Sequence, residues 1–137
     1  MTSKKQQTLL TNLELAVMRV VWDSQSGPPT VRDVVDQLNA GRRKPLAYNT
    51  VQTMLTILKE KGVVESRAGA GRAHRFRPRI TRAEVTTSMV GDLVERLFDG
   101  NVQPLLLQLV GNESMSRDEL ENLKMIIESQ LDDDEAP

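Results

Sequence analysis

The chain has 137 residues, which is enough for one ordinary domain or two small ones. It contains no cysteine, which excludes disulfides, thiolate metal sites and cysteine nucleophiles. The first residues are polar and lack the apolar core of a signal peptide. No apolar run approaches the roughly 20 residues of a membrane helix. We therefore expect a cytoplasmic protein without membrane insertion.

The net charge of −1 conceals an uneven distribution of charged side chains. Residues 42–82 carry 11 basic and 2 acidic residues, whereas residues 83–137 carry 3 basic and 13 acidic ones. One compact basic segment in a near-neutral chain is typical of a nucleic-acid contact. The alternative is a solvated basic surface loop.

The first forty residues predict two helices. Thr11 or Asn12 can cap a first helix over about 12–24, in which apolar residues recur at helical spacing, namely Leu13, Val17, Val20 and Val21. The run SerGlyProPro at 26–29 ends this helix. Thr30 can cap a second helix over about 30–40, and a basic loop follows.

A third helix is predicted over about 47–61, with Gly62 placed to end it. On a helical wheel one side is apolar, formed by Val51, Met54, Leu55 and Leu58. The opposite side and its flanks carry short amides and hydroxyls, namely Asn49, Thr50, Gln52 and Thr53. Such groups can hydrogen-bond the edges of bases in a DNA major groove.

A β-hairpin is predicted directly after this helix. Val63 and Val64 begin a strand, GlyAlaGly at 69–71 suits the turn, and His74 and Phe76 lie on the return strand. The hairpin and its end carry five arginines, at positions 67, 72, 75, 77 and 79. A helix-turn-helix followed by a hairpin is the winged helix-turn-helix arrangement, in which the hairpin is the wing.

The remaining residues predict three further helices. Thr81 with Glu84 and Ser116 with Glu119 form capping boxes, and an acidic, frayed tail is expected at 132–135. The apolar surface of these helices exceeds what a soluble monomer usually exposes, so we expect a dimer. The residues expected to form its interface are Leu93, Leu97, Leu105, Leu106, Leu109, Leu120, Leu123, Ile127 and Leu131. The alternative is that these helices pack on the N-terminal part as a monomer.

The predicted fold is thus mainly α with a small β-hairpin wing. Residues 1–80 form a winged-helix DNA-binding domain, and residues 81–137 form a helical dimerisation domain with an acidic tail. His74 is the only histidine, and the sequence shows no nucleophile–base pair and no metal-ligand pattern. We therefore expect a protein that is not an enzyme and that needs no metal or cofactor.

Three motifs resemble the penicillinase-repressor family, which includes the BlaI, MecI and CopY branches. They are LeuGluLeuAlaValMet at 13–18 with Trp22, the AlaTyrAsnThrVal helix that starts at 47 and ends in LysGly, and GlyArgAlaHisArgPheArgPro at 71–78. The resemblance covers about residues 10–131. It implies a homodimeric repressor with a winged helix and a helical dimerisation domain, which binds a palindromic double-stranded DNA operator.

The resemblance also assigns roles to residues. Bases would be contacted by Asn49, Thr50 and Thr53, with Gln52 at the groove edge. Phosphates would be contacted by Arg67, Arg72 and Arg75, with His74 as a neighbour, and by Arg42, Arg43, Lys44 and Tyr48 at the helix entrance.

The copper-responsive branch has cysteine pairs that are missing here, which leaves the BlaI/MecI branch. In that branch a membrane sensor-protease cuts an Asn–Phe bond, and the bond at the matching position here is Gln108–Leu109. Two other functions remain open from the residues alone. One is a winged-helix regulator that responds to a small ligand, and the other is a winged helix that binds proteins.

Overall fold

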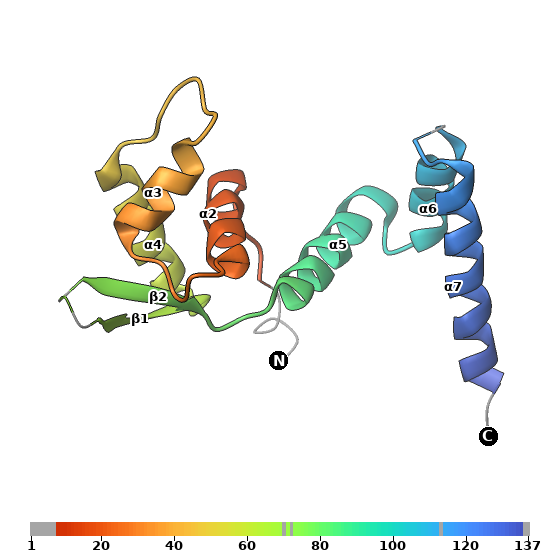
Figure 1. The fold of residues 1–137 in the computed structure, drawn as a ribbon. Coiled ribbons are helices and arrows are strands. Elements are labelled where there is room, and N and C mark those ends of the chain that lie inside the picture. Colours follow the sequence, from red (N-terminus) through yellow and green to blue (C-terminus); the bar gives the residue numbers. More distant parts are fainter. Residues whose placement is uncertain (1–7, 70, 72, 113, 136–137) are drawn as a thin grey trace. The chain divides into compact units, whose positions relative to one another are not determined.

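The computed structural model describes residues 8–69, 71, 73–112 and 114–135, and the chain divides into two compact units (Figure 1). The first unit ends at Val90 and the second begins at Gly91. The sequence predicts a boundary between residues 80 and 81, whereas the units meet inside α5 (Arg82–Phe98). The reason is that Val85, on the first turns of α5, is buried in the core of the first unit and Met89 packs against it.

Three helices and a hairpin form most of the first unit. The helices are α2 (Asn12–Asp23), α3 (Val31–Asn39) and α4 (Tyr48–Glu60), and the strands are β1 (Val64–Ala68) and β2 (His74–Pro78). The strands pair antiparallel, and Thr30 forms an isolated bridge with Arg75 on β2. This order confirms the predicted winged helix-turn-helix.

Local signals set the helix ends in this unit. Thr11 and Thr30 form capping boxes with Glu14 and Asp33, so each threonine hydroxyl accepts a hydrogen bond from an N–H in the first turn. Gly62 has φ of +80° after the last residues of α4, a conformation that glycine adopts without strain. The chain can therefore leave α4 and enter β1 within a few residues.

The core of the first unit is apolar and continuous across these elements. Val51, Leu55 and Leu58 on α4 are 0% exposed and pack with buried residues from α2, α3, β1 and β2. Met54, expected on the same face, is half-buried at its edge. On α2 the buried stripe differs from the predicted one: Met18 and the carboxylate of Glu14 are buried, whereas Leu13 and Val20 are half-buried.

The second unit contains the end of α5 with α6 (Val102–Gly111) and α7 (Arg117–Glu135). Asp99 and Gly100 have positive φ and end α5, and the side chain of Asn101 caps α6. α7 continues through residues 132–135, so the prediction of a frayed acidic tail there is wrong. No glycine or proline lies between 117 and 135, so nothing interrupts the helical hydrogen bonds.

We expect Leu55→Ala to lower the free energy of unfolding by about 2–5 kcal/mol, because it leaves a cavity beside a fully buried face of α4. Leu9→Ala is the matched control, since Leu9 is 43% exposed and loses little packing. Urea denaturation followed by circular dichroism measures both values. Equal losses in the two variants would contradict the assigned core.

Candidate nucleic-acid interface

α4 presents a polar face opposite its buried one. The side chains predicted to contact bases are all exposed on it, namely Asn49, Thr50, Gln52 and Thr53. Thr56 is also exposed, and its hydroxyl donates a hydrogen bond to the carbonyl of Gln52 at 3.0 Å. The remaining amides and hydroxyls have no hydrogen bond within the described residues, so they are available to a ligand.

The loop before α4 is held by one side chain. The amide of Asn39, at the end of α3, donates to the carbonyl of Leu46 at 3.0 Å and accepts from its N–H at 2.7 Å. This pair closes the loop that carries the predicted basic residues, which are Arg42, Arg43 and Lys44, all exposed. The loop's positive charge is therefore kept beside the entrance of α4.

The register of the hairpin separates its side chains into two faces. Ser66 pairs with Phe76 and Ala68 with His74, and Phe76 is buried against the core. Because side chains two residues apart on a strand lie on the same face, His74 lies on the same side of the hairpin as Phe76. His74 is exposed there and lies toward α4, since both His74 and residues of α4 line one groove.

Arg67 and Arg75 lie on the other face of the hairpin, directly opposite each other. The guanidinium of Arg75 donates to the carbonyl of Pro28 at 2.8 Å, whereas Arg67 is exposed and has no ion pair in the described part of the chain. Like charges in a directly opposed pair repel each other, and a bound anion relieves that repulsion. Arg72, the third predicted phosphate contact, lies outside the described residues.

A groove of about 450 Å³ lies between α4, the start of α3 and the hairpin. α4 contributes Tyr48, Gln52, Thr56 and Lys59 to its lining. The guanidinium of Arg32, on the first turn of α3, stacks over the ring of Tyr48 at 5.0 Å from the ring centre. Such a cation–π contact holds both exposed side chains at the rim of the groove.

Arg32 and Lys59 also line this groove, and neither was predicted from the sequence. A signal for Arg32 is present, because in helix-turn-helix proteins the helix before the recognition helix crosses the DNA backbone. An exposed arginine on its first turn is therefore a candidate phosphate contact. Lys59 gives no such signal, since a lysine in the last turn of a helix commonly serves only solubility or the helix dipole.

The second unit exposes much of its apolar surface. Of the residues expected to form a dimer interface, Leu97, Leu106, Leu109, Ile127 and Leu131 are exposed. The others are half-buried, namely Leu93, Leu105, Leu120 and Leu123. Gln108 and Leu109 are both exposed and lie inside α6.

The described residues contain no group of three or more histidine, aspartate or glutamate side chains that could hold a metal ion. None of the helices in the described ranges is both long enough and apolar enough to cross a membrane.

The fold and this surface define a class of protein. Three helices with a wing, a third helix that exposes amides and hydroxyls, and basic residues at both of its ends are the features of winged-helix DNA-binding regulators. Residues 10–129 match the penicillinase repressor family. The chain belongs to this family of transcriptional repressors.

Two relatives show how far the similarity extends. The transcriptional regulator BlaI of Mycobacterium tuberculosis is 37% identical over 118 residues, which cover 85% of this chain and 81% of that protein. The penicillinase repressor of Bacillus licheniformis is 25% identical, over 87% of this chain and 89% of the relative. The solution structure of the DNA-binding domain of the repressor BlaI is 27% identical over 55% of this chain and 85% of that domain, with a TM-score of 0.46.

Proposed function

We propose that the protein acts in the cytoplasm as a homodimer that covers a palindromic operator and excludes RNA polymerase from the promoter. The observation that carries this proposal is the exposed polar face of α4 between two sets of basic residues. Phosphates are attracted at both ends of the helix, while amides and hydroxyls between them contact base edges.

The roles divide by chemistry. Asn49 contacts a base, since an amide can bond an adenine edge through both of its polar atoms, and Thr50, Gln52 and Thr53 complete that contact surface. The predicted cations contact phosphates, with Tyr48 and His74 at their side; these are Arg42, Arg43, Lys44, Arg67, Arg72 and Arg75. Arg32 is added to these phosphate contacts because it lies at the rim of the groove.

The exposed leucines and isoleucines of the second unit support the dimer. A two-fold axis buries the same patch on both copies and brings two recognition helices to two half-sites. Leu97 and Leu107 are each 67% exposed, which a monomer in water disfavours. We therefore place the contact between copies in this unit.

Release from DNA is proposed to follow cleavage at Gln108–Leu109 by a membrane sensor-protease. Within one copy both residues are exposed, and because Leu109 belongs to the expected dimer interface, the bond becomes accessible where the two copies separate. The bond lies in the last turn of α6, so local unwinding of this helix has to precede cutting. Within one copy α6 has no core residue, so mainly the contact with the second copy opposes such unwinding.

Binding to DNA is tested by a salt series. Two copies that neutralise about 6–10 phosphates give a log–log slope of the binding constant against salt of about −5 to −9. The measurement is a fluorescence-anisotropy titration with a duplex that the protein has selected from a random pool. A slope near zero, or the absence of any selected sequence, would overturn the proposed function.

Base and phosphate contacts are separated by two substitutions. We expect Asn49→Ala to weaken binding to the selected duplex by about 1–3 kcal/mol and to relax preference at one base pair. Arg67→Ala is the comparison, and we expect it to weaken all duplexes alike, because a phosphate contact carries no base identity. The assignment is wrong if Arg67→Ala changes the preferred base at one position.

The dimer is tested by shortening the chain. A protein that ends at Gln108 lacks α7 and the end of α6, and with them Leu120, Ile127 and Leu131. We expect sedimentation equilibrium to show a monomer with weaker binding to the selected duplex. A persistent dimer of the shortened protein would place the contact between copies elsewhere.

A further inference from the structure

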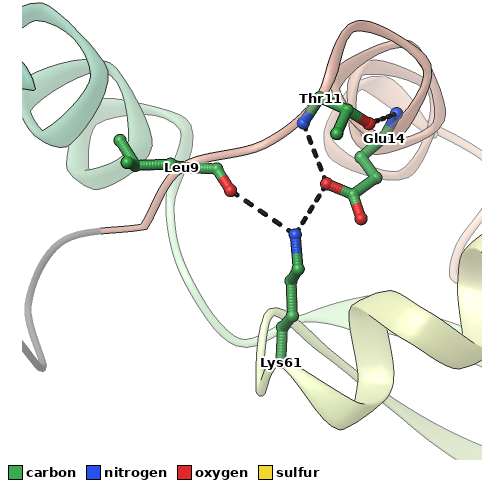
Figure 2. Close-up of polar contacts among 4 residues, drawn as sticks. All are labelled: Leu9, Thr11, Glu14 and Lys61. Carbon is green, nitrogen blue, oxygen red and sulfur yellow. Dashed lines mark hydrogen bonds and ion pairs between the residues drawn. The ribbon is translucent and has the colours of Figure 1, made fainter.

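One carboxylate in the first unit lies in an unusual position. Glu14, on the first turn of α2, is 3% exposed, and it is the one buried charged residue among those the structure describes. One oxygen of its carboxylate accepts hydrogen bonds from the N–H of Thr11 at 2.9 Å and from the ammonium of Lys61 at 2.8 Å (Figure 2). The same ammonium also donates to the carbonyl of Leu9 at 3.5 Å.

Capping α2 does not explain this arrangement. Three other helices of the chain begin with the same kind of box, formed by Thr30 with Asp33, Thr81 with Glu84, and Ser116 with Glu119. The carboxylates of those boxes are exposed, and within the described residues none of them forms an ion pair. A helix of this protein is therefore capped without burial and without a lysine.

Stability also gives little reason for this pair. The Glu14 side chain is 4% exposed and loses water, whereas the Lys61 side chain is 39% exposed, so water screens the attraction that has to offset the burial of the carboxylate. Burial raises the pKa of Glu14, but hydrogen bonds from Lys61 and Thr11 lower it, and the pKa remains below its ordinary value. The carboxylate is therefore charged at neutral pH and holds the ammonium in a defined place.

Lys61 lies at the junction between α4, the proposed recognition helix, and the hairpin that forms the wing. Lys61 is the C-cap of α4, and its N–H bonds the carbonyl of Ile57 at 2.9 Å. Val63 follows two residues later and forms two backbone hydrogen bonds. Its N–H donates to the carbonyl of Leu58 on α4 at 2.9 Å, and its carbonyl accepts from the N–H of Arg79, just after β2, at 2.8 Å. A displacement of Lys61 therefore moves the end of α4 and the base of the hairpin together.

We infer that Glu14 is a positioning residue for DNA recognition, which acts through Lys61 to fix the end of α4 and the start of the wing against the beginning of α2. With this pair in place, the polar face of α4 and the hairpin keep one fixed orientation to each other. Both can therefore contact the same DNA segment, with each side chain of α4 opposite one defined base pair. The inference rests on the proposed function and adds a residue that touches no DNA. Base contacts depend on this fixed orientation, whereas nonspecific attraction to phosphates does not.

The test compares two duplexes of equal length, one selected by the wild-type protein from a random pool and one unrelated. Glu14→Gln keeps an acceptor for the N–H of Thr11 and removes the charge that holds Lys61. The quantity measured is the dissociation constant for the unrelated duplex divided by that for the selected duplex. We expect this ratio to fall about tenfold in Glu14→Gln, which corresponds to the loss of roughly one base contact. Lys61→Arg keeps a cation for Glu14 and is expected to retain most of the ratio.

Two controls separate positioning from folding. Glu84→Gln makes the same chemical change in an exposed capping box, and we expect it to leave the ratio unchanged. The double variant with Glu14→Gln and Lys61→Met removes both charges of the pair and leaves neither without its partner, so it remains testable if the single variant unfolds. Thermal unfolding by circular dichroism identifies the folded variants.

A folded Glu14→Gln or double variant with an unchanged ratio would overturn the positioning role and leave the proposed function intact. Equal weakening on both duplexes would also overturn it, because that result indicates only a smaller folded fraction. A wild-type protein that selects no sequence would overturn the proposed function together with this inference.

Discussion

The proposed DNA interface depends on the burial of one face of α4. Val51, Leu55 and Leu58 have no exposed surface, so the helix cannot rotate about its axis without bringing apolar side chains into water. A helix has a fixed angular step, and burial of one face therefore fixes the direction of the other. The position of Asn49 and its polar neighbours follows from core packing, although none of these side chains contributes to that core.

The charges of the chain are arranged around this helix. Asn39 holds the basic loop before α4, and the hairpin after α4 places Arg67 opposite Arg75. Repulsion between such close cations is tolerated because they are exposed, where water and salt screen them. In the proposed complex a phosphate backbone removes the repulsion, so the arrangement that slightly disfavours the free hairpin favours DNA binding.

The second unit follows a different physical rule. α6 has no buried residue, and large apolar side chains on α5 and α7, such as Leu97 and Met125, are 67% exposed. Three helices of this size have too little interior to cover their apolar faces. In the proposed dimer a second copy supplies the missing cover, and the symmetric contact matches the two-fold symmetry of a palindromic site. Dimer formation and DNA recognition are parts of one arrangement in this proposal.

Features that depend on neighbours along the chain were predictable from the residues. Capping boxes at Thr11 and Thr30, the turn at Gly62, the polar face of α4 and the hairpin are set by local hydrogen bonds and by helical or strand periodicity. The burial of Glu14 against Lys61 and the stacking of Arg32 on Tyr48 were not predictable. Neither was the extension of the first unit into α5. Each of these features is a contact between residues that are distant in sequence. A local sequence pattern cannot predict such a contact, because only the packed core brings the two partners together.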